Sequence, residues 1–577
     1  MSFEKSQRNI LPQEFDLKQY SDIEPFLKSL LSKNFESKET LEKWIYEYSE
    51  IDAYLSENLA WRYINYTRHT DNEALSNAYS FFIKEIQPEL VKVENQLNKK
   101  QTSSEYFDSL PDNELLNYKK KANLSIELFR EENIALEVEQ SNLSQEYASI
   151  IGAMSIDMDG KELTMQQAAK LLQGENRKER KEVFEKINEK RLENKDKLDG
   201  LFDKLTELRQ QQAKNCGFEN YRDFKHKALG RFDYTVDDAK KFQNAIERVA
   251  VPYLGKLLQK RKSALGFETL RPYDLAVNIY DSKPLKPFES GSELLDKSIK
   301  CFDTIDPFFG DVLRAMKEKG FVDLESRKGK APGGYNYPLD EHGLPFIFMN
   351  ASGSMRDVTT MVHEGGHAIH TVLARDLKVN ALKHCPSEVA ELASMSMELI
   401  SMDAWNVFFD NEKDLLRAKI EQLEGVLDVL PWIATVDNFQ HWIYTNTPNG
   451  SEERDAGWIE ILNKFSSNIV DHTGYENFRR NQWQKQLHIF EVPFYYIEYG
   501  IAQLGAIALW RNYKKNSGKA LDEYKAALSL GYTKTIPEIY NTAGIKFDFS
   551  EEYVAELLDF IWNEYSELVD EYHSLKD

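Results

Sequence analysis

The stretch MRDVTTMVHEGGHAIHTVLAR, residues 355–375, decides how the rest of this sequence is interpreted. Its apolar residues recur at the spacing of a helix with one buried face: Val358, Met361, Val362 and Ile369. His363 and His367 are four residues apart, so in a helix their imidazoles stand on one face, one turn from each other. The stretch therefore predicts a helix that carries two histidines side by side.

Two imidazoles in this arrangement can bind a single metal ion. Zinc binds histidine nitrogen at ~2.0–2.1 Å, a distance that both side chains can reach at once. Glu364 follows the first histidine and projects beside the metal, where its carboxylate can act as a general base. The alternative is an ordinary helix with two surface histidines. Because only 11 of the 577 residues are histidine, the pattern favours a zinc site.

A zinc site needs a third protein ligand, and catalysis needs an open fourth position. Residues 386–401, PSEVAELASMSMELIS, predict a second helix that offers Glu388, Glu391 and Glu398. Glu391 and Glu398 are seven residues apart and share a face, which Glu388 shares in part. Small residues between them would let this helix approach a neighbour closely. Spacing alone leaves the choice among the three carboxylates open.

Both segments resemble motifs of the M3 metallopeptidases, the thimet oligopeptidase and oligoendopeptidase F family. The likeness rests on HEGGHAIH at 363–370 and VAELASMSME at 389–398. It continues in GGY at 333–335, LPFIFMN at 344–350 and PFYYIEYGIAQLGA at 493–506. The resemblance is strongest to the oligoendopeptidase F branch and covers the chain from about residue 150 to the end.

The resemblance implies how the metal is held. It implies one Zn²⁺ per chain, bound by His363, His367 and Glu391. Glu398 then becomes the hydrogen-bond partner of a zinc histidine, and Glu364 remains the general base.

The resemblance also implies residues that contact the substrate carbonyl and the tetrahedral intermediate. In the family these are a histidine upstream of a tyrosine pair and the tyrosines themselves, which correspond here to His488, Tyr496 and Tyr499. We expect Tyr495 to lie in the core instead.

Further residues are expected to bind the peptide or to support the site. We expect strand 344–350 to hold an extended peptide by edge pairing, and we take Tyr335, Phe346 and Phe348 as substrate-binding residues. His370 is expected to play a supporting or packing role, and His384 to lie on the surface.

The function that the resemblance implies is zinc-dependent hydrolysis of internal peptide bonds in short peptides, inside a deep channel between helical lobes. A zinc carboxypeptidase of related helical fold is one alternative, against which the segment PFYYIEY argues. A non-catalytic peptide-binding protein on a peptidase fold is another, but such proteins usually lose the base or a ligand. An M1-type aminopeptidase is disfavoured because no GxMEN-like element occurs upstream.

Composition excludes other classes of partner. The net charge of −22 would repel nucleic acid and anionic membrane surfaces, and the most basic stretch, residues 177–197, interleaves its cations with Glu and Asp. We therefore expect no nucleic-acid or membrane partner, and no obligate protein partner is evident from the sequence. Three scattered cysteines, no apolar leader and no uncharged window of about 18 residues lead us to expect a cytoplasmic protein.

The fold expected from these patterns is mainly α: a large two-lobed helical zincin with a small β-sheet beside the active-site helix. We place the N-terminal helical lobe in residues 1–190 and the catalytic lobe in 191–577. Residues 193–210 predict an amphipathic helix, and residues 154–163 predict a hairpin that turns at Asp159-Gly160. Thr164 and Gln167 form a capping box that begins the next helix.

Overall fold

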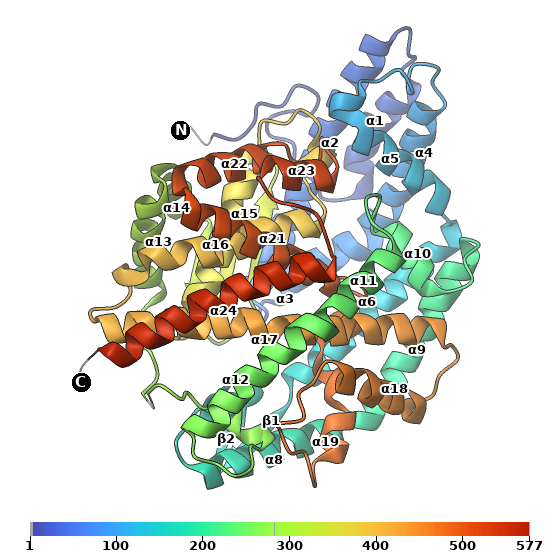
Figure 1. Ribbon diagram of the computed structural model, residues 1–577. Coiled ribbons are helices and arrows are strands. Elements are labelled where there is room, and N and C mark those ends of the chain that lie inside the picture. Colours follow the sequence, from blue (N-terminus) through green and yellow to red (C-terminus); the bar gives the residue numbers. More distant parts are fainter. Residues whose placement is uncertain (1–3, 282, 576–577) are drawn as a thin grey trace. The chain divides into compact units, whose positions relative to one another are not determined.

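The computed structural model describes residues 4–281 and 283–575, and its regular structure is almost entirely helical (Figure 1). The expectation of a mainly α fold is therefore confirmed. No helix within these described residues combines the length and the apolar content that crossing a bilayer requires.

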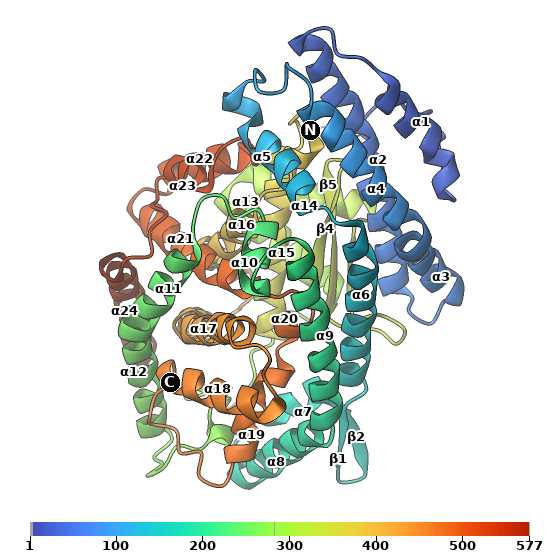
Figure 2. The ribbon, with the colours of Figure 1, turned by 90° about the vertical axis from the view of Figure 1, so that its right-hand side faces the viewer.

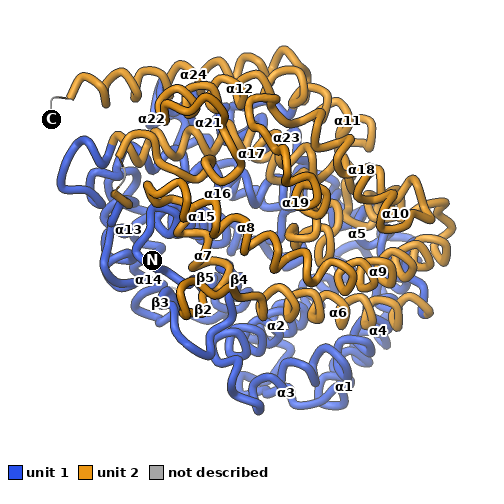
Figure 3. The backbone as a smooth tube through the Cα atoms, turned by 90° about the horizontal axis from the view of Figure 1, so that it is seen from below, with its two compact units in different colours: residues 1–131, 285–415, 505–547 blue, residues 132–284, 416–504, 548–577 orange. Residues whose placement is uncertain are grey.

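The chain forms two compact units, each assembled from three segments (Figure 3). Unit 1 consists of residues 1–131, 285–415 and 505–547, and unit 2 of residues 132–284, 416–504 and 548–577. The boundary predicted from the sequence is a single one, near residue 190. That position lies inside the helix Arg177–Glu193, so the chain continues there as regular structure within unit 2.

Unit 1 contains the predicted metal helix and a layer of helices around it. Its first segment supplies the helices α1 (Tyr20–Ser32), α2 (Lys38–Arg68), α3 (Glu73–Phe81), α4 (Gln87–Thr102) and α5 (Asp112–Leu128). The later segments supply α13 (Gly291–Ile305), α14 (Pro307–Lys319), α15 (Met355–Ala374), α16 (Ser387–Ile400), α22 (Ser517–Ser529) and α23 (Ile536–Thr542). Helices α13, α14 and α16 all contact α15, which places the metal helix in the interior of this unit (Figure 1).

A three-stranded sheet lies beside α15, as expected (Figure 2). Its strands are β3 (Val322–Glu325), β4 (Tyr335–Leu339) and β5 (Leu344–Ala351), in the order β3-β5-β4. β5 pairs in parallel with β3 and antiparallel with β4, so both of its edges are used. The expectation that strand 344–350 offers an edge to a peptide is therefore wrong, because it is the central strand; β4 is at the edge of the described sheet.

Unit 2 is a second set of helices with one small hairpin. It comprises α6 (Glu131–Gly152), α7 (Met165–Leu171), α8 (Arg177–Glu193), α9 (Lys195–Asn215), α10 (Tyr221–Ala228), α11 (Val236–Ala245), α12 (Val251–Ala264) and α24 (Glu551–Ser574). It also holds α18 (Ser451–Lys464), α19 (Glu476–Arg480), α20 (Leu487–Phe490), most of α17 (Glu412–Thr445) and the start of α21 (Tyr496–Lys515).

The hairpin of unit 2 follows the predicted pattern. β1 (Ser155–Met158) pairs antiparallel with β2 (Lys161–Thr164), and both turn residues, Asp159 and Gly160, have positive φ angles of 54° and 80°. Positive φ angles at both turn residues are typical of the two-residue hairpin turn whose twist matches that of the two strands it joins. The capping box is present as well, because Thr164 and Gln167 exchange hydrogen bonds at the start of α7.

Candidate metal centre

The start of α15 is determined by one carboxylate. Asp357 accepts hydrogen bonds from the backbone nitrogens of Ser352 and Ser354, each at 2.9 Å, and from the Ser354 hydroxyl at 2.8 Å. Such a cap provides an acceptor for backbone N–H groups that have no hydrogen-bond partner within the helix at its N-terminus. Since β5 ends at Ala351, the cap begins the helix directly after the central strand and sets the direction in which its two histidines point.

Close approach of α15 and α16 depends on a glycine. A Cβ atom on Gly366 would lie 2.6 Å from Ser394 Cα and 2.7 Å from the Ala393 carbonyl oxygen, distances that no other residue could accommodate. Neighbouring helices hold α16 in this place through its backbone: the hydroxyl of Tyr524 donates to Ala393 O at 2.8 Å and that of Tyr540 to Glu388 O at 3.0 Å.

The two helices bring three predicted ligands together. The donor atoms of His363, His367 and Glu391 all lie within 4.8 Å of one another. Glu391 Oε2 is 3.4 Å from His363 Nε2 and 3.7 Å from His367 Nε2. Ligands ~2.0–2.2 Å from a tetrahedral ion are roughly 3.3–3.6 Å apart, so the arrangement fits a metal ion. Among the described residues, this is the one such group of three histidine, cysteine or carboxylate side chains.

The other two carboxylates of α16 have different positions. Glu398 Oε1 lies 2.7 Å from His363 Nδ1, the nitrogen on the opposite side of the ring from the ligand atom, and so it can orient the imidazole. Glu388 is 1% exposed and is not a member of the ligand group. The serine Ser394 donates to Glu391 Oε2 at 3.1 Å and steadies the third ligand, a contact that the sequence analysis did not predict.

Burial dominates the electrostatics of the centre. It raises the pKa of Glu364 to about 7, against the opposing effect of the neighbouring His363. It lowers the pKa of His367 to about 4, which favours the neutral imidazole that metal binding requires. For His363 burial also lowers the pKa, but hydrogen bonds to Glu391 and Glu398 outweigh it and raise the pKa well above its usual value.

A residue of the edge strand supports the predicted base. Asn336 of β4 donates from Nδ2 to the backbone oxygen of Glu364 at 3.0 Å, which ties the strand to the metal helix at that position. The sequence analysis missed Asn336. Its only signal is its place directly after the GGY motif at 333–335.

Two further histidines have structural partners. The ring of His370, expected in a supporting role, lies with Nε2 3.5 Å from Cys385 Sγ, and burial lowers its pKa to about 3. His384 was expected on the surface, and its side chain is 41% exposed, while its Nε2 pairs with the buried Asp340 at 3.0 Å. Asp340 directly follows β4, so this pair connects the segment between α15 and α16 to the end of that strand.

The predicted histidine and tyrosines come together in unit 2. The ring of His488 is 4.7 Å from that of Tyr496 and 5.8 Å from that of Tyr499, and the two tyrosine rings are 5.5 Å apart. Tyr495 belongs to the same cluster, with its ring 5.2 Å from Tyr499 and 6.1 Å from His488. The expectation that Tyr495 lies in the core is therefore wrong: it is half-buried, because it precedes the first regular turn of α21.

An unusual backbone conformation precedes these tyrosines. Phe494 has a φ of 66°, a left-handed conformation that is strained for a residue other than glycine. Three contacts hold it: Gln440 accepts from its backbone nitrogen at 2.7 Å, the guanidinium of Arg231 donates to its backbone oxygen, and the same guanidinium pairs with Glu498 at 2.7 Å. Both members of the ion pair are buried, with side chains 3% and 5% exposed.

The predicted substrate-binding residues separate into two groups. Phe346 and Phe348 are fully buried in the central strand, so their side chains cannot contact a peptide, and that prediction is corrected. Tyr335 is half-buried in the edge strand, with its hydroxyl 2.6 Å from Thr67 Oγ1. The rings of Tyr335 and Phe348 stack at 4.7 Å, so the phenylalanine supports the tyrosine from beneath.

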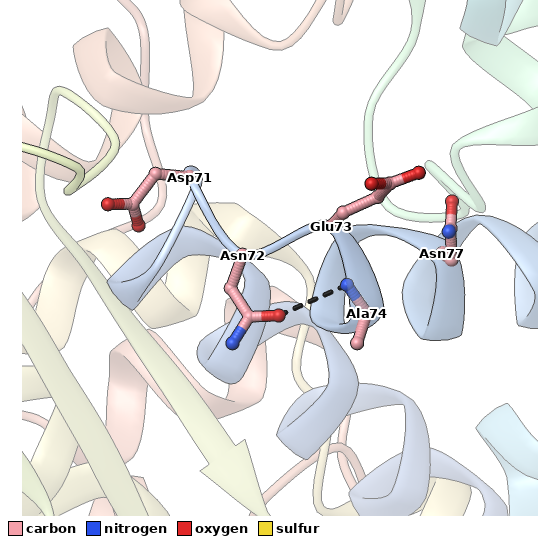
Figure 4. Close-up of a pocket in the computed structure, with 5 residues that line it drawn as sticks. All are labelled: Asp71, Asn72, Glu73, Ala74 and Asn77. Carbon is pink, nitrogen blue, oxygen red and sulfur yellow. Dashed lines mark hydrogen bonds between the residues drawn. The ribbon is translucent and has the colours of Figure 1, made fainter.

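A separate open depression lies at the beginning of α3 (Figure 4). Its lining residues are Asp71, Asn72, Glu73, Ala74 and Asn77. The Asn72 side chain caps the helix by accepting from Ala74 N at 3.1 Å. None of these residues belongs to the metal-ligand group, so the depression and the metal centre are different features.

Comparison with known families matches most of the chain. The model of peptidase family M3 matches residues 170–558, and the model of the peptidase M3 N-terminal domain matches residues 13–129. The first of these alone covers more than half of the sequence and includes the candidate metal ligands.

Individual relatives agree with these matches. An oligoendopeptidase F homolog of Borreliella burgdorferi is 25% identical over 421 residues, which are 69% of this chain and 68% of the relative. The oligopeptidase PepF of Bacillus subtilis is 22% identical over 401 residues, 67% of this chain and 57% of the relative. The solved structure of PZ peptidase A with an inhibitor superposes with a TM-score of 0.90 at 25% identity, over 96% of this chain and 98% of that one.

Proposed function

The chain belongs to peptidase family M3 and is a metallo-endopeptidase, and on that premise we propose that its metal is zinc and that its substrates are short peptides. The observation that carries the proposal is the group of His363, His367 and Glu391. Two imidazoles and one carboxylate are the donor set of catalytic zinc sites, which leave a fourth position open.

The three ligands would hold one zinc ion per chain. When bound, the ion polarises the carbonyl of the scissile bond and lowers the pKa of a water molecule. Glu398 orients His363 through its Nδ1 and strengthens it as a ligand. Ser394 and the close contact at Gly366 keep Glu391 within reach of both histidines.

Glu364 is the proposed general base. Its carboxylate takes a proton from the attacking water and later returns it to the amine that leaves. The burial that raises its pKa to about 7 suits both steps, since a base that must also act as an acid works best with a pKa near the working pH. Asn336 holds the backbone of this residue and so limits how far the carboxylate can move.

The donors to the oxyanion are proposed from the family resemblance. His488, Tyr496 and Tyr499 would donate hydrogen bonds to the carbonyl oxygen as it gains negative charge. The three rings lie 4.7–5.8 Å from one another, close enough for their donor groups to contact the same oxygen atom.

We propose that the peptide lies along β4. Because β5 is paired on both sides, the edge strands of the described sheet are β3 and β4, and an extended chain can add to such an edge through main-chain hydrogen bonds. We choose β4 because it is the edge strand that is hydrogen-bonded to the helix that carries Glu364. Tyr335 would contact the peptide from this strand, and Asn336 connects the same strand to the base. We also propose a cytoplasmic location, with which the three free cysteines of the chain are compatible.

Incubation with a mixed peptide library, followed by mass spectrometry, tests the proposal. We expect cleavage at internal bonds, equal for peptides with free and amidated C-termini, and abolished by a chelator. Cleavage that requires a free C-terminus would indicate a carboxypeptidase instead. Zinc should restore activity to stripped protein, and its failure to do so while another metal succeeds would contradict the metal assignment. Rapid digestion of native folded proteins would contradict the restriction to short peptides.

A further inference from the structure

The side chain next to His488 has a defined orientation. Gln486 lies two residues before the histidine, and its Oε1 accepts a hydrogen bond from the indole nitrogen of Trp432 at 3.1 Å. An indole N–H can only donate, so the atom that faces it must be the amide oxygen and not the amide nitrogen. Trp432 therefore fixes which end of the Gln486 amide faces which neighbour.

The other end of the amide faces the histidine. Gln486 Nε2 lies 2.8 Å from His488 Nδ1. An amide NH₂ group can only donate, so Nδ1 must be the acceptor in this contact, and the proton of a neutral imidazole must then sit on Nε2. We infer that Gln486 is a positioning residue, oriented by Trp432, that fixes the Nε2-protonated tautomer of His488.

The inference deepens the proposed function and rests on it for its catalytic meaning. A neutral histidine with its proton on Nε2 presents a hydrogen-bond donor on the side of the ring that points away from Gln486. With the proton on Nδ1 the same side would present a lone pair, which repels a developing oxyanion. Gln486 thus determines whether a neutral His488 presents a donor to the developing negative charge.

The surroundings keep this chain of hydrogen bonds in place. Trp432 belongs to α17 and packs with its ring 5.6 Å from the fully buried Trp458. Gln486 is the N-cap residue of α20, the short helix that contains His488, so the amide and the imidazole are held on one rigid turn. Burial raises the pKa of Tyr496, whereas hydrogen bonds from Trp432 and Gln486 lower it, so the same two side chains also reach the neighbouring tyrosine.

The decisive measurement is the tautomer itself, read in the full-length zinc-loaded protein. Two-bond ¹⁵N–¹H correlation spectra of protein labelled at histidine distinguish a protonated ring nitrogen from an unprotonated one, and His488→Gln identifies the signals of this residue. We expect Nε2 protonated and Nδ1 unprotonated in the wild type. A proton on Nδ1 would overturn the inference. Because this measurement is made on the wild-type protein, it does not depend on whether a Gln486 variant folds.

Removal of the amide supplies the second test. Gln486→Met keeps the length of the side chain but not its donor, so the Nε2-protonated form should lose its dominance and kcat should fall by about tenfold to a hundredfold, with little change in KM or zinc content. Gln482→Met makes the same replacement four residues earlier and should leave the spectrum and kcat as in the wild type. An unchanged tautomer in Gln486→Met would overturn the inference.

Comparison of the kcat values of the two variants distinguishes failure of the inference about Gln486 from failure of the donor role proposed for His488. If Gln486→Met changes the tautomer and kcat stays constant, Gln486 sets the proton position as inferred, but the donor role proposed for His488 is wrong. If His488→Gln lowers kcat while Gln486→Met changes neither the tautomer nor the rate, the donor role stands and the role of Gln486 is refuted.

Discussion

The metal centre of unit 1 and the histidine–tyrosine segment of unit 2 are built in different ways. All candidate ligands of the centre come from two regular helices: His363 and His367 lie one turn apart on α15, and Glu391 comes from α16. The segment from Gln486 to Tyr499 contains one short helix, a left-handed residue and the beginning of a longer helix. Its conformation depends on side chains far away in the sequence, among them Arg231 and Trp432.

The two parts therefore respond differently to substitution around them. In the centre, His363 and His367 lie one turn apart on α15, and close packing of α15 against α16 at Gly366 brings Glu391 to them. In the segment, Tyr496 and Tyr499 lie on α21 but His488 lies on the separate short helix α20, so the arrangement depends more on the individual contacts that hold these pieces.

Loss of a metal ligand should have the largest effect. Glu391→Ala removes the carboxylate that contacts both histidines, so the protein should lose its metal and all measurable activity. Elemental analysis after dialysis checks this. Glu398→Gln should only weaken metal binding, by about tenfold to a hundredfold, because it acts through His363. Glu388→Gln should keep the metal; its loss there, with Glu391→Ala still loaded, would reverse the ligand assignment.

Replacement of the base should separate chemistry from binding. Glu364→Gln has nearly the same shape, so zinc content and peptide affinity should stay close to those of the wild type. Proton transfer is lost, and kcat should fall by about 10²–10⁴. Single-turnover kinetics together with binding of a labelled peptide measure both quantities. Full turnover in this variant would assign the base to another residue.

Replacement of the tyrosine hydroxyls should have a smaller effect on the same step. Tyr499→Phe removes a donor that matters chiefly in the transition state, so kcat should fall by about 10²–10³ with little change in KM. Tyr496→Phe should have a weaker or mixed effect. Tyr495→Phe should be nearly silent in kcat and serves as the matched control within the same ring cluster. A rise in KM alone for Tyr499→Phe would make its hydroxyl a ground-state contact.

The buried ion pair should reveal how much the unit 2 segment relies on a distant residue. Arg231→Met leaves Glu498 and the Phe494 carbonyl without their guanidinium partner, so stability should fall by about 3–5 kcal/mol and kcat by roughly tenfold. Arg248→Met removes an exposed pair with Glu551 and should cost less than about 1 kcal/mol, with kcat unchanged. Equal losses of stability and kcat in both variants would show that the segment does not depend on Arg231.

Spacing along one helix predicted the two histidines of the candidate metal centre, because side chains four residues apart share a helix face. His363, Glu364 and His367 follow from a period of 3.6 residues, and the family resemblance then selected Glu391 among three carboxylates that the spacing could not separate. The structure agrees with that choice, since Glu391 alone of the three lies within 4.8 Å of both histidines as a member of the ligand group.

Features that depend on contacts between segments distant in sequence became evident only in the folded structure. Strand 344–350 is apolar whether it is central or at an edge, and its pairing with two partners settles the matter. Tyr495 was expected in the core, and only the folded structure places its ring against those of Tyr499 and His488. Gln486 carries no motif, because its role comes from a hydrogen bond to an indole 54 residues earlier in the chain. The helical period predicts which side chains share a face of one helix. Strand order and side-chain networks, in contrast, form only when separate segments pack together.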